Sequence, residues 1–325
     1  MQFSTRVARA LTMALALACA SPSAAQQAYP SKPIRFIVPY PPGGTTNLMS
    51  RLIGQKLTES FGQPVVIDNR PGGNTIIGTD ALARAKPDGY TILLTSSIHV
   101  ITPLLIPTPY DPIKDFAPIT TTTITEQVLA VHPSVPADTL QELIALAKSR
   151  PGQLNYATAT GGGPTHLATE LLSLMTGIKL QHIPYKGGAQ VVTDLLGGQV
   201  QMAFQSPIAV VAHIKNGRLK GIAVSGPARL AALPQMPTFT EAGLPGFDVK
   251  YWQGVFAPAG TPEEIINWLS VEIAKIMRAT DVREKLAAQG LDTFTSTPAQ
   301  FAALVKADLA NYSRIIKEAN IKADQ

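Results

Sequence analysis

The chain has 325 residues, of which 45% are hydrophobic and 15% charged, enough apolar material for one large or two medium cores and an argument against a disordered chain. Its formal charge of +5 comes from 27 basic and 22 acidic residues, with no run of five or six like charges. A nucleic-acid-binding tail and a polybasic membrane patch are therefore not expected.

The N-terminal segment has the features of a secretory signal. Arg6 and Arg9 precede an apolar run over 10–20, and small residues follow at 23–25. We predict a signal peptide over 1–25, because the apolar run is shorter than the roughly 20 residues of a membrane-spanning helix. The only cysteine, Cys19, lies in this segment, and its spacing from Leu17 does not fit a lipoprotein signal, so a mature chain without disulfides is expected.

Short β-branched runs then alternate with Gly- and Pro-rich turns and amphipathic helical stretches, which is typical of parallel βαβ architecture. In the first part of the mature chain we predict a helix over 48–57, a second helix ending near residue 85, and strands over 34–38, 65–67 and 91–94. A second unit begins near Gln127, and its predicted strands cover 128–131, 154–157, 180–183, 200–204 and 219–224. Its first helix follows a capping box formed by Thr139 and Glu142.

The last part of the chain returns from the second unit to the first. Residues 227–245 contain too many prolines and glycines for a long regular element, and a strand is predicted over 249–257. Thr261 is predicted to cap a helix that begins at Pro262. We expect two helices to finish the chain, divided at Gly290 and Pro298.

Two loops join a predicted strand to a helix start and are rich in glycine. The first covers 39–47 and the second covers 158–166. Unpaired backbone N–H groups and the helix dipole favour an anion at such a position, although either loop could simply make a turn and cap its helix. Two such loops, one in each unit, favour a ligand-binding role.

Other candidate residues are open to two interpretations. His166 and Glu170 have the i,i+4 spacing of metal ligands but lack further ligands, so His166 is expected to line the cleft and no metal is predicted. Lys186 could offer a cation to a carboxylate or be a solvated surface lysine. Trp252 could form a wall of the site or belong to the core.

Sequence signatures of catalysis are missing from the mature chain. It contains no G-x-S-x-G, H-E-x-x-H or S-x-x-K motif, no P-loop lysine after the glycines, and no G-x-G-x-x-G. A hydrolase built from Ser96, Ser206 and His166 is conceivable, but no third group at a recognisable spacing supports it. No catalytic residue and no cofactor is predicted.

Ordered motifs along the whole mature chain resemble one family, the tripartite tricarboxylate transporter substrate-binding proteins, also called the Bug family. The resemblance rests on IVPYPPGG, DNRPGGN, AKPDGYTILL, PGQLNYATATGGGPTHLA, HIPYKGGAQ, DLLGGQV, PTFTEAGLPGF and WQGVFAPAGTP. It implies an α/β type II periplasmic binding protein fold, in which two doubly wound lobes enclose a ligand cleft. Residues 26–127 plus 250–325 would form lobe 1, and residues 128–249 would form lobe 2.

The resemblance also implies which residues bind the ligand. Motif positions carry this role over to Tyr40, Gly43, Gly44, Thr45, Thr46, Asn47, Thr95, Ser96, Ser97, Thr158, Thr160, Gly161, Gly162, Gly163, His166, Lys186, Gln205 and Ser206, with Trp252 as a further candidate. Family members commonly have Asp where this chain has Asn47, and often near Gln205. The loss of both carboxylates argues against an amino-acid ligand and favours a di-, tri- or aromatic carboxylate.

The resemblance implies the partners as well. They are a small organic acid and the membrane permease subunits of a tripartite transporter. The protein is expected to be a monomer in the periplasm. An alternative is a sensory protein that docks on a membrane receptor, since both roles would use the same ligand-gated surface. A cytoplasmic binding protein is disfavoured by the predicted signal peptide.

Overall fold

The computed structural model describes residues 29–42, 45–159, 162–185, 187–247, 249–287 and 291–321. The predicted signal peptide over 1–25 lies outside these residues. The chain divides into an N-terminal segment, Met1–Ser31, and one compact body, Lys32–Gln325, which contains both sheets. Within the described residues, no helix combines the length and apolar character needed to cross a membrane.

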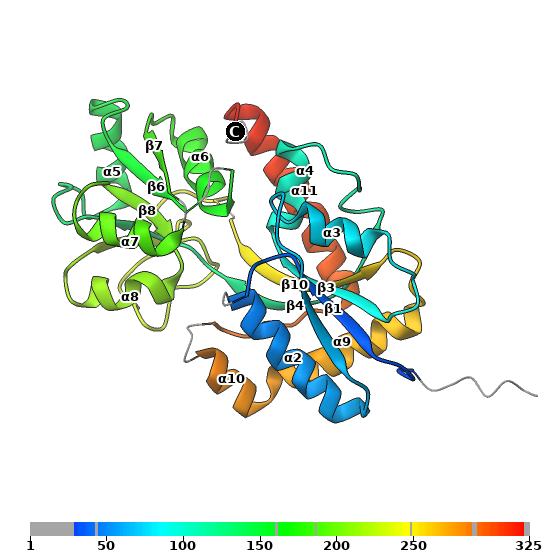
Figure 1. The fold of residues 1–325 in the computed structure, drawn as a ribbon. Coiled ribbons are helices and arrows are strands. Elements are labelled where there is room, and N and C mark those ends of the chain that lie inside the picture. Colours follow the sequence, from blue (N-terminus) through cyan, green and yellow to red (C-terminus); the bar gives the residue numbers. More distant parts are fainter. Residues whose placement is uncertain are drawn as a thin grey trace, which may run out of the picture. The chain divides into compact units, whose positions relative to one another are not determined.

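Two five-stranded mixed sheets form the framework, as the βαβ pattern predicted (Figure 1). The first sheet has the order β2-β1-β3-β10-β4, with strands β1 (Ile34–Val38), β2 (Val65–Asn69), β3 (Thr91–Ser96), β4 (Phe116–Thr125) and β10 (Tyr251–Pro258). The second has the order β7-β6-β8-β5-β9, with strands β5 (Val128–Val131), β6 (Asn155–Thr158), β7 (Gln181–Pro184), β8 (Met202–Gln205) and β9 (Lys220–Val224). The predicted α/β fold with two sheet-centred lobes is confirmed.

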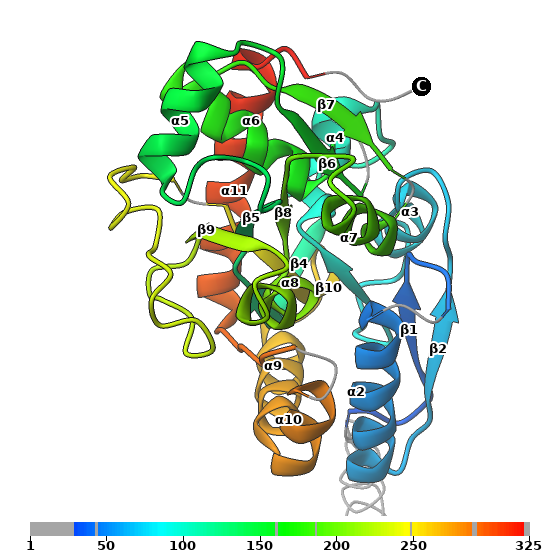
Figure 2. The same cartoon turned by 90° about the vertical axis from the view of Figure 1, so that its left-hand side faces the viewer.

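Helices cover both faces of each sheet, so inner strands such as β1 and β5 are near-continuous apolar runs. Around the first sheet they are α2 (Thr45–Phe61), α3 (Ile76–Ala83), α4 (Ile98–Leu105), α9 (Glu263–Arg278), α10 (Thr280–Ala287) and α11 (Pro298–Glu318). Around the second they are α5 (Leu140–Ser149), α6 (Pro164–Thr176), α7 (Gly188–Leu196) and α8 (Pro207–Lys215). Figure 2 shows α2 and α9 in one layer, and the two helices contact each other.

The strand β5 illustrates how alternation builds a two-sided core. Leu129 and Val131 belong to the cluster that includes α5 and α6 side chains, whereas Val128 and Ala130 belong to the cluster around α7 and α8. All four β5 residues are buried. Because successive strand residues point to opposite faces, an uninterrupted apolar run is what a doubly covered strand requires.

Several elements differ from the prediction. The sequence patterns did not predict α4, β4 or α8. Helix α4 contains Pro103, and β4 contains four consecutive threonines, Thr120 to Thr123. The predicted cap at Thr261 is wrong, because its hydroxyl donates to the Pro258 carbonyl at 2.7 Å and α9 begins at Glu263. Three helices follow β10 within the described residues instead of the two predicted, because Ala279 is extended and separates α9 from α10.

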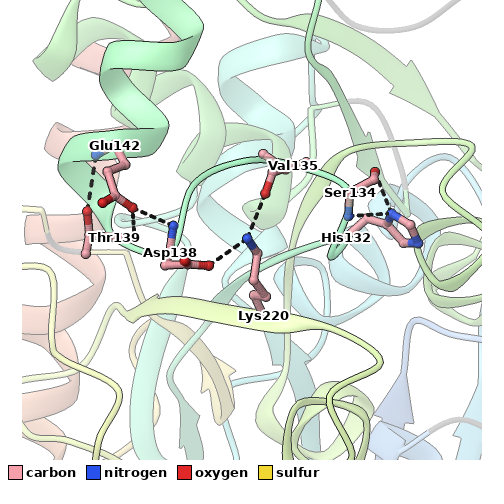
Figure 3. A network of polar contacts seen from close by, with 7 residues as sticks. All are labelled: His132, Ser134, Val135, Asp138, Thr139, Glu142 and Lys220. Atoms are coloured by element: carbon pink, nitrogen blue, oxygen red, sulfur yellow. Dashed lines mark hydrogen bonds and ion pairs between the residues drawn. The ribbon is translucent and has the colours of Figure 1, made fainter.

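A polar network fastens β9 to the segment between β5 and α5 (Figure 3). The Lys220 ammonium donates to the Val135 carbonyl and to the Asp138 carboxylate, both at 2.7 Å. The Asp138 N–H in turn donates to Glu142, the acidic member of the predicted capping box, which is confirmed. One lysine therefore ties together a strand and the start of a helix.

We expect Lys220→Met to lower the free energy of unfolding by about 1 kcal/mol, because it leaves a partly buried carbonyl without its charged donor. Urea denaturation at pH 7 measures this loss. Lys215→Met, at an exposed lysine near the end of α8, is the matched control and should change the free energy by less than about half as much. Equal losses for the two variants would contradict a stabilising role of the network.

Candidate functional site

The ends of β1 and β3 bring three of the predicted residues together. These strands are parallel, so the loops that follow them lie at the same edge of the sheet. The Tyr40 hydroxyl, in the loop after β1, lies 2.7 Å from Ser96 Oγ and 3.4 Å from Thr95 Oγ1. Burial raises the pKa of the Tyr40 phenol, against the hydrogen bonds from Ser96 and Thr95 that lower it, so Tyr40 is a neutral hydroxyl at pH 7.

A chain of amides holds the loop after β1 in place. Asn47 Nδ2 donates to Asn69 Oδ1 at 3.0 Å, and Asn69 Nδ2 donates to the Tyr40 carbonyl at 3.0 Å. Asn47 Oδ1 accepts from Arg51 Nε at 3.1 Å. Asn47 is therefore engaged within its own lobe and positions the Tyr40 loop. Thr46 beside it is buried, Gly43 and Gly44 lie outside the described residues, and Thr45 is the first residue of α2.

The Gly-rich loop after β6 is anchored by two histidines. His182 Nε2 lies 2.7 Å from the Thr158 hydroxyl, and the Gly162 N–H donates to His166 Nδ1 at 2.8 Å. The two imidazole rings stack with their centroids 4.0 Å apart and their planes 21° apart. Gly162 has a φ of 69°, which favours glycine. Thr160 and Gly161 lie outside the described residues, and Gly163 is the N-cap of α6.

His166 is a buried neutral imidazole that supports this loop. Burial, followed by the neighbouring His182, lowers the pKa of His166 to about 4. Because Nδ1 accepts a hydrogen bond, the ring proton is on Nε2, which faces Glu170 Oε1 at 3.8 Å. The Tyr156 hydroxyl also donates to Glu170. The arrangement supports Gly162 at the start of α6, and the Ser96 hydroxyl is bonded to Tyr40 and not to an imidazole.

The remaining predicted residues are divided between the site edge and the core. Gln205 is buried at the end of β8, and Ser206 is the N-cap of α8 without a side-chain capping bond. Lys186 lies outside the described residues. Trp252 is fully buried, and its Nε1 donates to Asp308 Oδ2 at 2.6 Å while its ring packs edge-on against Phe301. Trp252 therefore occupies a core position, and the proposed site does not include this residue.

Two residues beside Trp252 were not among the predicted site residues. Tyr251 and Gln253 flank Trp252 on β10 and therefore point to the opposite face, where Ser96 lies. Burial raises the pKa of the Tyr251 phenol, with Tyr40 as a second cause, against hydrogen bonds from Ser96 and Gln253. Strand alternation around Trp252 is the signal that could have identified both.

The described site residues are neutral donors and acceptors. Hydroxyls of Tyr40, Thr95, Ser96 and Thr158 and the amides at the starts of α2 and α6 offer hydrogen bonds without a carboxylate among them. Helix starts and hydroxyl groups of this kind stabilise an anion. Across the described part of the chain, no three His, Cys, Asp or Glu side chains gather in a way that could hold a metal ion.

Comparison with known families and proteins gives a consistent result. Residues 49–321 match the TctC family, described as the tripartite tricarboxylate transporter family receptor. Protein BugT of Bordetella pertussis (strain Tohama I) is 37% identical over 321 residues, which cover 98% of this chain and 98% of BugT.

Solved structures are similar over the same extent. A Rhodopseudomonas palustris protein, Rpa4515, solved with adipate, is 32% identical with a TM-score of 0.75, and the match covers 91% of this chain and all of that one. MatC (Rpa3494) from Rhodopseudomonas palustris, solved with bound malate, is 28% identical with a TM-score of 0.72, and the match covers 89% of this chain and all of MatC.

Proposed function

Because this chain belongs to the tripartite tricarboxylate transporter receptor family, as its motifs predicted, we propose that it is a periplasmic solute-binding protein that captures a small organic carboxylate. The observation that carries the ligand class is the group of buried, uncharged hydroxyls formed by Tyr40, Thr95 and Ser96 at the sheet edge. Adipate and malate are the ligands of two similar proteins. The protein would pass its ligand to membrane permease subunits.

We propose that the ligand lies between lobe 1, residues 26–127 plus 250–325, and lobe 2, residues 128–249. The change of sheet supports these boundaries, since β4 ends at Thr125 and β5 begins at Val128, and β10 begins at Tyr251. The loop containing Tyr40 belongs to lobe 1, and the loop held by His166 belongs to lobe 2. Binding is expected to shift the lobes toward closure by contacts that only the closed form makes.

Ligand capture without catalysis is part of this proposal. The Ser96 hydroxyl is bonded to Tyr40, and His166 is buried with its Nδ1 already accepting from the Gly162 N–H. A nucleophile needs a base within hydrogen-bond reach, which this pairing does not supply to Ser96. Unchanged ligand recovered after prolonged incubation with the protein would agree with pure binding, and a new product would overturn it.

The secretory route has its own test. We propose that the signal peptide over 1–25 is removed before Gln26 and that the mature chain is a monomer in the periplasm. Mass spectrometry of protein isolated from the periplasmic fraction should give a chain that begins at Gln26. A chain that retains Met1 and stays in the cytoplasm would contradict this location.

Thermal unfolding against mono-, di- and tricarboxylates, aromatic acids and amino acids tests the ligand class. Selective binding at 100-fold excess over Kd stabilises the native state by about 2.7 kcal/mol, so a specific acid should raise Tm clearly. Stabilisation by plain carboxylates supports the proposal. Stabilisation by amino acids alone would overturn the assignment of a carboxylate without an amine.

We expect Tyr40→Phe to weaken binding of the stabilising acid about tenfold, because it removes one hydroxyl from the hydrogen-bonded group that holds the ligand. Isothermal titration calorimetry measures the change. Tyr110→Phe is the matched control, since the Tyr110 hydroxyl is buried in the same lobe and makes no hydrogen bond to a predicted site residue. A similar loss of affinity in both variants would mean that Tyr40 acts only through general stability.

A further inference from the structure

A row of three polar side chains crosses the first sheet next to the proposed site. Gln253 on β10 is in register with Ser96 on β3 and with Thr123 on β4. Directly opposed residues of antiparallel strands point to the same face with Cβ atoms about 5 Å apart. Ser96 is bonded to Tyr40, so the row Ser96–Gln253–Thr123 continues the site toward β4.

Two members of this row have unused hydrogen-bonding groups. Gln253 Oε1 and Thr123 Oγ1 are buried without a hydrogen-bond partner, and the two residues are only 1% and 0% exposed. Tyr251 is a hydrogen-bond partner of the Gln253 side chain, and the amide oxygen is the atom left without a partner. An unpaired buried polar group is destabilising, so two of them side by side indicate a position that another molecule completes.

The chemistry of the two groups limits what can complete them. An amide oxygen only accepts hydrogen bonds, whereas a threonine hydroxyl donates one and accepts others. A hydroxyl group satisfies both, because it donates to Gln253 Oε1 and accepts from Thr123 Oγ1. A carboxylate cannot donate, and an ammonium would bury a positive charge beside side chains that are all uncharged.

We propose that Gln253 and Thr123 are specificity-determining residues that bind a hydroxyl group of the ligand, so that the protein prefers a hydroxy acid over the matching acid without the hydroxyl. This inference rests on the proposed function, since it assumes a carboxylate ligand held by the neighbouring hydroxyls. In this arrangement the carboxylate of the ligand binds near Tyr40, and the hydroxyl of the ligand binds to Gln253 and Thr123 on the sheet.

Matched acid pairs that differ by one hydroxyl test the inference by calorimetry on the mature protein. The pairs are propionate and lactate, succinate and malate, tricarballylate and citrate, and phenylacetate and mandelate. For the pair that binds, the hydroxylated member should bind at least tenfold more tightly. Aspartate, with an ammonium in place of the malate hydroxyl, should bind at least tenfold more weakly than malate if the C4 pair is the one bound.

Three variants identify the residues responsible. Gln253→Met keeps the length of the side chain without its acceptor and should reduce the preference to threefold or less. Thr123→Val should do the same, while its Tm without ligand stays equal to or above the wild-type value, because the lost hydroxyl had no partner. Thr122→Val is the control: this threonine is already bonded to the Gln253 carbonyl at 3.2 Å, and the variant should keep the full preference.

The outcomes separate the two proposals. Carboxylate binding without a hydroxyl preference, or a preference that persists in both Gln253→Met and Thr123→Val, overturns this inference and leaves the proposed function intact. A lower ligand-free Tm of Thr123→Val with unchanged preference assigns Thr123 a structural role and also overturns it. If no carboxylate in the panel binds, both proposals are overturned.

Discussion

Gly254→Ala is expected to lower the free energy of unfolding by about 2–3 kcal/mol, because the new methyl group has no space in a closely packed core. A Cβ at this position would lie 2.2 Å from Phe301 Cζ and 2.6 Å from Phe301 Cε1. Phe301 is fully buried and packs against Trp252 and Phe256. An aromatic ring surrounded in this way cannot move aside as the end of a flexible chain can. Urea denaturation measures the loss.

Two companion variants show that the loss comes from the ring. Gly221→Ala in β9 would meet Met236 Sδ at 2.7 Å, and because the methionine end is flexible we expect a smaller loss than for Gly254→Ala. Phe301→Leu makes room for the methyl group. The double variant Gly254→Ala/Phe301→Leu should therefore lose less free energy of unfolding than the two single losses added together, by about 1 kcal/mol or more. Additive losses would contradict the steric account.

Local sequence patterns predicted most of the regular structure. The strand over 34–38 has the predicted bounds, and Thr139 and Glu142 form the predicted capping box, since both depend on neighbouring residues alone. The four consecutive threonines of β4, Thr120 to Thr123, gave no apolar alternation, yet all four are buried. Thr120 and Thr121 are bonded to Ser296, which is about 175 residues away in the chain. Such a contact depends on tertiary structure, which local patterns do not contain.

The candidate site was predictable in its loops but not in its supports. Glycines after a strand mark the loops around Tyr40 and Gly162, and their positions at strand ends follow from parallel pairing. The stack of His166 on His182 joins α6 to β7, and no local spacing relates the two. Identifying Gln253 as a site residue requires the alternation of β10 and also its register with β3 and β4. Only the assembled sheet provides that register.

Acid is expected to destabilise the protein strongly between pH 6.5 and pH 4, because two histidines are buried in their neutral form. Burial lowers the pKa of His99 to about 4, against the hydrogen bond from its Nε2 to the Pro112 carbonyl, and the pKa of His166 is also about 4. An unfolded histidine has a pKa near 6.5, so the unfolded chain binds more protons than the folded one throughout this range.

The sign of the effect follows from that difference. The free energy of unfolding is highest above pH 6.5, where both forms are neutral, and falls as the pH drops toward 4, where the unfolded chain takes up protons first. Each histidine contributes a loss of up to about 3 kcal/mol over this range. Urea denaturation at pH 7.5, 6.5, 5.5 and 4.5 measures the slope of the unfolding free energy against pH. Near pH 5 this slope should correspond to the uptake of almost two protons on unfolding.

Variants assign the slope to individual residues. His99→Phe should reduce it by about one proton near pH 5, and it suits the site because His99 stacks on Phe256 and packs edge-on against Phe116. His166→Asn should remove the second proton while keeping an oxygen that can accept from the Gly162 N–H. Phe116→Leu is the control, since it perturbs the same aromatic cluster without removing a titratable group and should leave the slope unchanged. A wild-type slope retained in both histidine variants would mean that other groups cause the acid sensitivity.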